Sequence, residues 1–192
     1  MPDNLHKKLN RFQNHIIKSE KPKRDLPERY LRLANFLKGK IVSNYAGSYC
    51  LVKTLYPFEY CHGNMMLRNI IDNHSLPLST FTVKNETENL ELSSMLFVDI
   101  ETTGLGGAGV VPFLIGCGIL TDYGFEIHQY LLPDYSDECS MLEDLLNQLS
   151  SDKTIVSYNG AAFDLPIIQD RMIINRVASE FNYKHHIDLL HS

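Results

Sequence analysis

The chain has 192 residues, of which 44% are hydrophobic and 21% are charged, and its formal net charge is −5. This balance is typical of a globular domain with an appendage, and it excludes a disordered chain, a collagen-like repeat and a coiled coil. The longest apolar stretch, residues 110–120, is interrupted by proline and glycine and is shorter than the roughly 20 residues that a membrane-spanning helix needs.

The start of the chain and the cysteines indicate a cellular compartment. The first residues, MPDNLHKKLNRF, contain no apolar run of the kind that a signal peptide needs. The four cysteines are scattered, and they form neither a CxxC pair nor a zinc-type spacing with histidine. We therefore predict a reduced, cytoplasmic setting.

Residues 1–40 are predicted to form a basic helical arm. They carry 11 Lys and Arg against 4 Asp and Glu, a charge of +7, whereas residues 41–192 carry 7 against 19, a charge of −12. Apolar residues spaced by three and four mark a helix over residues 5–16, and residues 27–39 contain a second helix with proline in its first turn. The apolar face of the second helix is predicted to consist of Leu31, Ala34 and Leu37. The arm either contacts nucleic-acid phosphates or an acidic partner, or it packs against the acidic remainder of its own chain.

Residues 41–92 are predicted to be rich in β-structure. The segment IVSNYAGSYCLVKTLY has the pattern of a hairpin with its turn at Ala46 and Gly47, and LPLSTFTV has the pattern of a further strand. The polar run KNETENLELSS then separates this portion from the C-terminal half of the chain. We place a domain boundary there.

Residues 93–192 are predicted to form a mixed α/β sheet. MLFVDI, VVPFLIGCGIL and GFEIHQYLL are three β-prone runs with short connections, which indicates an antiparallel meander. A helix over residues 141–149, the strand TIVSY, a helix that starts near Asp164 and the strand HIDLL follow in that order. The fold class is therefore α/β, with a three-strand meander followed by α-β-α-β.

Two carboxylates end the first strand of this region. Asp99 and Glu101 are two residues apart, so they share one face of the strand while Ile100 points to the other. Neighbouring carboxylates at the edge of an apolar sheet repel each other and lose hydration, at a cost on the order of several kcal/mol unless cations are present. Oxygen ligands suit Mg²⁺ or Mn²⁺ better than zinc. The alternative interpretation is a solvated strand end.

A second acidic motif, SYNGAAFD, places Asp164 at the predicted start of a helix. An aspartate in this position is an ordinary helix N-cap, which is the alternative to a functional role. The β-β-α-β connection between the two motifs allows their acidic groups to meet at one end of the sheet, where folds of this class bind ligands.

Together, DIETTGL and YNGAAFD resemble the first two motifs of the DEDD exonucleases, which act 3′ to 5′ and have a ribonuclease H-like fold. The similarity is closest to the YprB-type ribonuclease H-like branch. FVDIETTGLGGAGVVPFLIGCG, HQYLLPD, VSYNGAAFDLPIIQDRMIINR and HIDLLH follow that branch in order, and the hairpin and GNMM resemble its N-terminal portion. The resemblance covers about residues 41–192 and implies a ribonuclease H-like sheet over residues 93–192.

The resemblance also implies a site for two Mg²⁺ or Mn²⁺ ions. Asp99 would bridge the ions, Glu101 would bind one of them and orient the attacking water, and Asp164 would hold the second ion. The implied partner is DNA or RNA with a single-stranded 3′ end. Four further positions are expected to contact the nucleic acid: Thr102, Thr103, Gly104 and Asn159. GLGGAG is no phosphate-binding P-loop, because it leads into a strand instead of a helix.

The resemblance is incomplete at its C-terminal end. DEDD enzymes carry a fourth carboxylate with a nearby general base, and this branch has them beyond HIDLLH, where the sequence stops. We therefore expect a truncated family member, whose independent catalysis is left open. Asp188 is expected to be a non-ligand, and His185, His186 and His191 are expected to be exposed or strand-end residues. A non-catalytic nucleic-acid-binding module and a protein-interaction module are the alternatives to an exonuclease.

Overall fold

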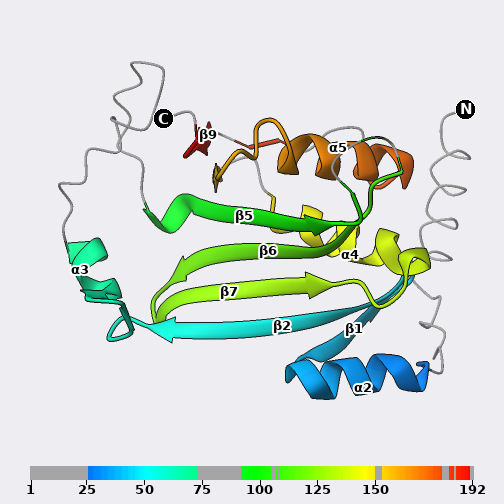
Figure 1. The fold of residues 1–192 in the computed structure, drawn as a ribbon, viewed down its shortest axis with the longest axis horizontal. Helices are drawn as coiled ribbons and strands as arrows, with labels where there is room; N and C mark the ends of the chain where they lie inside the picture. Colours follow the sequence, from blue (N-terminus) through cyan, green and yellow to red (C-terminus); the bar gives the residue numbers. More distant parts are fainter. Residues whose placement is uncertain are drawn as a thin grey trace, which may run out of the picture.

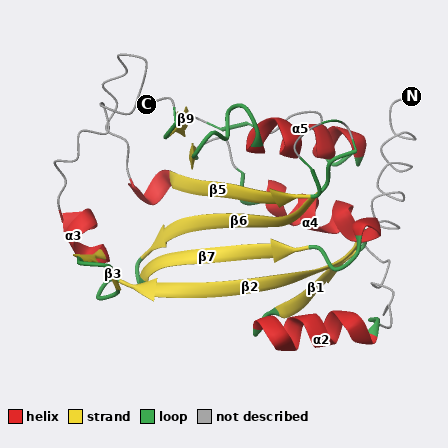
Figure 2. Ribbon diagram, in the orientation of Figure 1, coloured by secondary structure: helices red, strands yellow, loops and turns green. Residues whose placement is uncertain are grey.

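The computed structural model describes residues 26–72, 92–104, 107, 109–149, 153–178, 182–183 and 185–190. Seven strands form one sheet in the order β1-β2-β7-β6-β5-β8-β9 (Figures 1 and 2). These strands are β1 (Lys40–Asn44), β2 (Gly47–Pro57), β5 (Met95–Thr102), β6 (Pro112–Thr121), β7 (Gly124–Leu131), β8 (Thr154–Ser157) and β9 (His185–Asp188). A separate two-stranded ribbon consists of β3 (Cys61–His62) and β4 (Met65–Met66). The predicted mixed α/β architecture is confirmed.

The strand order follows from local connections. β5, β6 and β7 are antiparallel neighbours, as the short connections predict, and β8 adds to β5 in parallel after the helical crossover. β9 extends the sheet in parallel with β8. The predicted N-terminal hairpin is also confirmed, with its turn one residue earlier than expected because Asn44 pairs with Gly47. The predicted strand LPLSTFTV lies outside the described residues.

In the described part of the chain the helices are α2 (Glu28–Leu37), α3 (Leu67–Asp72), α4 (Glu138–Leu146) and α5 (Asp164–Ile174), with 3₁₀ turns at Leu92–Ser94 and Tyr135–Asp137. α2 is the predicted second helix of the arm, whereas residues 5–16 lie outside the described part of the chain. The predicted apolar face of α2 was wrong at Leu31, which is exposed. Tyr30 is buried instead, because its hydroxyl donates a hydrogen bond to Asp137 and turns that side of the helix inward.

The two faces of the sheet differ around β5. Leu96, Val98 and Ile100 point into the main core, where they join buried residues of α4 and α5. The core residues that these two helices contribute are Met141, Leu142, Leu145, Leu165, Ile168 and Met172. In Figure 1, α4 accordingly lies behind β5 and β6. We call this side the helix face and the opposite side, which carries Asp99 and Glu101, the open face.

The four cysteines are free thiols. Within the described residues, no helix is both long and apolar enough to cross a membrane.

Candidate functional site

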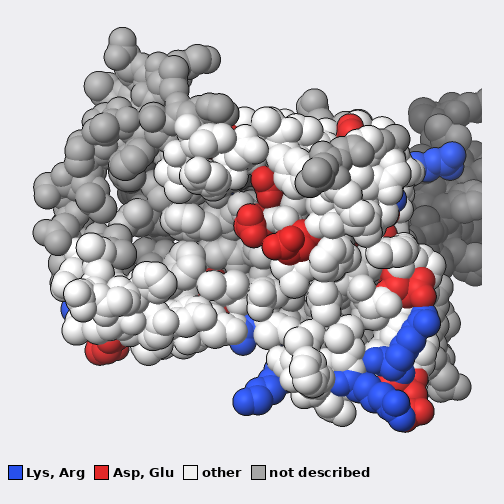
Figure 3. All heavy atoms as spheres, in the orientation of Figure 1, with Lys and Arg blue, Asp and Glu red and all other residues white. Residues whose placement is uncertain are grey.

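Asp99 and Glu101 lie near the C-terminal end of β5. Both side chains are exposed, whereas Ile100 between them is 5% exposed and belongs to the main core. The period-two prediction that the two carboxylates share one face is therefore confirmed. Figure 3 shows acidic side chains gathered near the middle of the viewed face, while Lys and Arg lie toward its edges.

Asp164 reaches the same strand from the start of α5. It is 4% exposed, and its Oδ1 accepts a hydrogen bond of 2.9 Å from the backbone N–H of Ile100. The N-cap interpretation does not hold, because Phe163 occupies the cap position and no side-chain capping bond forms there. The aspartate instead joins the helix start to the strand that carries the other two carboxylates.

Burial perturbs the carboxyl group of Asp164. Burial raises its pKa, the hydrogen bond from Ile100 lowers it, and the negative charges of Asp99 and Asp188 raise it further, so that the net change is upward. Ionisation is therefore less favourable here than for a solvated carboxyl group. Three carboxylates from β5, α5 and β9 are thus electrostatically coupled at one end of the sheet.

Asp188, at the end of β9, organises the turn before α5. Its Oδ1 accepts hydrogen bonds from the N–H groups of Asn159 (2.7 Å) and Leu190 (3.1 Å), and its Oδ2 accepts one from Ala161 (2.9 Å). Burial opposes ionisation, but these three donors lower the pKa of Asp188 overall. Asn159 sits in this turn with φ of +62°, a left-handed conformation that asparagine tolerates. The carboxylate of Asp188 therefore holds the turn before α5 through backbone donors.

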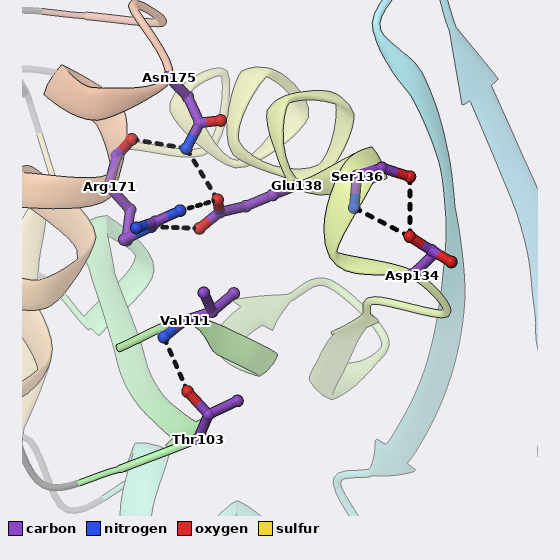
Figure 4. A network of polar contacts seen from close by, with 7 residues as sticks. All are labelled: Thr103, Val111, Asp134, Ser136, Glu138, Arg171 and Asn175. Carbon is purple, nitrogen blue, oxygen red and sulfur yellow. Dashed lines mark hydrogen bonds and ion pairs between the residues drawn. The ribbon is translucent and has the colours of Figure 1, made fainter. Parts of the chain in front are cut away.

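The loop after β5 is held by its threonines. The hydroxyl of Thr102 donates to the carbonyl of Gly104 at 2.6 Å. The hydroxyl of Thr103 accepts from the N–H of Val111 at 3.0 Å (Figure 4). The N–H of Thr103 donates to the carbonyl of Val111 at 3.1 Å. The loop leads into β6, as predicted. Both threonine side chains therefore shape the loop beside Glu101.

A buried ion pair joins α4 to α5, and no sequence pattern predicts its pairing. Glu138 is 3% exposed and accepts hydrogen bonds from both Nε of Arg171, at 2.7 Å, and a terminal nitrogen of the same guanidinium. The amide of Asn175 donates to Glu138 at 2.8 Å and to the carbonyl of Arg171 at 2.9 Å (Figure 4). This network fixes α5, whose first residue is Asp164, against α4.

Two of the predicted strand histidines lie in the described part of the chain. His185 and His186 are half-buried in β9, and His186 Nε2 lies 2.8 Å from the hydroxyl of Ser157. Burial lowers the pKa of His186 against the opposing charge of Asp188, so this imidazole is neutral near pH 7. His191 lies outside the described residues.

The donor atoms of the site suit a hard divalent cation, although their present spacing does not form a coordination sphere. Asp99, Glu101 and Asp164 offer only carboxylate oxygens, which Mg²⁺ and Mn²⁺ prefer. In the part of the chain that the structure describes, no three His, Cys, Asp or Glu side chains are close enough together to hold a metal ion.

The described fold is a seven-stranded mixed sheet, and acidic residues lie near the end of β5, which is antiparallel to β6 and parallel to β8. The chain belongs to the RNase H superfamily, whose family profile matches residues 96–192. It is also similar to the uncharacterized protein YprB of Bacillus subtilis (strain 168), with 32% identity over 154 residues. That match covers 74% of this chain but 35% of the relative, so the chain spans about a third of the length of the curated relative it matches. The ribonuclease H-like, YprB-type resemblance is confirmed.

Proposed function

We propose that this chain binds nucleic acid and carries the carboxylates of a metal-dependent 3′ to 5′ exonuclease site. One observation carries the proposal: buried Asp164 is tied to the backbone of β5 at 2.9 Å, beside the exposed pair Asp99 and Glu101. Burial and neighbouring negative charges raise the pKa of Asp164. Carboxyl groups perturbed in this way are concentrated at functional sites. Membership in the RNase H superfamily supports it.

Asp99 and Glu101 would hold Mg²⁺ or Mn²⁺ from β5, and Asp164 would hold it from α5. The bound ions would supply charge stabilisation for the attacking and leaving oxygens of a phosphodiester. Groups of the chain itself hold Asp164 and the turn before it in position. The N–H of Ile100 fixes one oxygen of Asp164, and Asp188 holds the turn that precedes it.

The proposed substrate is a single-stranded 3′ end of DNA or RNA. Because the hydroxyls of Thr102 and Thr103 hold the loop beside Glu101, we propose that this loop, with Gly104, brings its backbone close to the terminal nucleotide. Asn159 would contribute by orienting the turn or by touching a phosphate. A negatively charged face repels a phosphate backbone, so binding at this site should require the divalent cation.

A nuclease assay on the chain itself tests the proposal. A 5′-labelled single strand is incubated with Mn²⁺ and with the wild type or the variants Asp99→Asn, Glu101→Gln and Asp164→Asn. The matched control is Asp122→Asn, since Asp122 is exposed in the β6–β7 turn at the opposite end of the sheet. We expect metal-dependent shortening from the 3′ end in the wild type and the control, and its loss in the three variants.

Two other outcomes are informative. Metal-dependent binding of the strand without shortening, lost in the same variants, would restrict the function to nucleic-acid binding. If the wild type neither binds nor shortens the strand at any Mn²⁺ concentration, the proposal is wrong.

A further inference from the structure

Gly116 lies directly beside Asp99, and packing within the described residues does not require a glycine there. Gly116 is the cross-strand partner of Asp99 in β6, and opposite residues of an antiparallel pair share a face. A Cβ built on Gly116 would meet only the backbone oxygen of Asp99, at 3.6 Å, which is ordinary van der Waals contact. Its φ is outside the left-handed range. The described part of the fold therefore has room for a side chain at position 116.

The next glycine on the same strand and face provides the contrast. A Cβ on Gly118 would lie 2.4 Å from the ring of Phe125 and 3.2 Å from Cβ of Phe97. These two aromatic rings meet edge to face above it, with their centroids 5.4 Å apart. Packing thus explains Gly118 but leaves Gly116 unexplained. Glycine inside a strand is unfavourable, and it often marks a place where a ligand approaches the backbone closely.

The residues around Gly116 indicate what would lie there. The sheet register places Asp99, Gly116 and Gln129 in one row across β5, β6 and β7, all on the open face. With strands about 4.8 Å apart, the row spans roughly 10 Å, comparable with a nucleoside. A carboxylate stands at one end of the row, and a carboxamide with both donor and acceptor groups stands at the other. The aromatic pair above Gly118 borders it along β6.

We infer that Gly116 is the floor on which a nucleoside of the substrate lies, next to the phosphate held through Asp99. This inference rests on the proposed function and deepens it. The size of the residue at position 116 would decide whether a nucleoside fits beside the carboxylates. The bare backbone lets the sugar and base lie flat against the sheet. The amide of Gln129 then meets polar groups at the far end of the nucleoside.

The test separates stability, metal binding and nucleotide binding. Gly116→Ala, Gly116→Val and the control Gly118→Ala are compared with the wild type for Tm, for Mn²⁺ affinity by calorimetry, and for affinity toward thymidine 5′-monophosphate with Mn²⁺ present. We expect both Gly116 variants to have a Tm at or above that of the wild type, because an added Cβ suits a strand. Their Mn²⁺ affinity should be unchanged. Nucleotide affinity should fall about tenfold or more in Gly116→Val and less in Gly116→Ala.

The control variant Gly118→Ala tests the effect of packing alone. Gly118→Ala should lower Tm, because its Cβ collides with Phe125. If Gly116→Val proves unstable, the alanine variant decides, since its Cβ fits. Unchanged nucleotide affinity in a stable Gly116 variant would overturn the inference and leave the proposed function standing. A wild type that binds neither Mn²⁺ nor the nucleotide would overturn both.

Discussion

The two faces of the sheet differ in what their residues contribute to the stability of the fold. On the helix face, Leu96, Val98 and Ile100 of β5 are buried against α4 and α5, and hydrophobic packing explains each of them. On the open face, the same strand presents Asp99 and Glu101 to solvent beside a bare glycine, which packing does not explain. Within the described residues of β5 and β6, those that packing does not explain lie on the open face, where the functional site is proposed.

The largest expected effect on stability lies on the helix face. Arg171→Ala removes the guanidinium from Glu138, which is 3% exposed, and leaves this buried carboxylate with the Asn175 amide as its side-chain donor among the described residues. We expect a loss of about 3 kcal/mol in the free energy of unfolding, measured by urea denaturation. Arg32→Ala is the control, because it removes a surface pair with Glu28 and should cost less than about 0.5 kcal/mol. Equal, small losses for the two variants would show that the α4–α5 network contributes little.

The second prediction concerns Asp188, whose carboxylate holds the turn before α5 at the end of the sheet that carries the acidic residues. Asp188→Ala leaves the N–H groups of Asn159, Ala161 and Leu190 without their acceptor, so we expect a loss of about 1–3 kcal/mol at pH 7. Since the pKa of Asp188 is lowered in the folded state, its stabilisation is present above its ordinary pKa of 3.8 and is lost as pH falls through the folded value.

The measurement for Asp188 is the difference in Tm between wild type and variant across pH. The difference should be largest near neutral pH and should shrink toward pH 3. A difference that is constant with pH would mean that the carboxylate charge does not hold the turn.

Unlike the two variants above, Asp164→Asn should not lower the stability of the fold, and its effect should be the smallest of the three. The amide oxygen can still accept the hydrogen bond from Ile100, while the buried charge disappears. Because the pKa of Asp164 is raised, the ionised form costs stability as pH rises through the folded value, whereas the protonated form carries no such cost. In EDTA at pH 7 we therefore expect a Tm equal to or slightly above that of the wild type, with the advantage gone below pH 3.8.

Added Mn²⁺ should reverse that order by raising the Tm of the wild type and leaving that of Asp164→Asn unchanged. A variant that is less stable than the wild type in EDTA would show that Asp164 has a structural role.

The sequence was most informative where the relevant contacts are local. Strand periodicity was sufficient to place Asp99 and Glu101 on one face, and short connections were sufficient to order β5, β6 and β7. The buried face of α2 was misjudged at Leu31 because the deciding contact, from Tyr30 to Asp137, joins residues 107 positions apart.

The interactions within the site were out of reach for the same reason. Asp164 was as consistent with a helix cap as with a bond to Ile100, 64 positions away. The hydrogen bonds that Asp188 accepts from the 159–161 turn depend on the register of β9 with β8, which pairs Asp188 with Ser157. Neither register nor long-range pairing has a signature in a single sequence. The matching of Asp99 with Gly116 likewise becomes visible only in the folded sheet.

Binding of Mn²⁺, followed by electron paramagnetic resonance, tests the central claim most directly. Free Mn²⁺ is titrated against the wild type, against Asp99→Asn and against the distant control Asp122→Asn. We expect saturable binding to the wild type and the control, and a weakening of about tenfold or more in Asp99→Asn. Three identical titrations would contradict the claim that the carboxylates of the open face form a divalent-cation site.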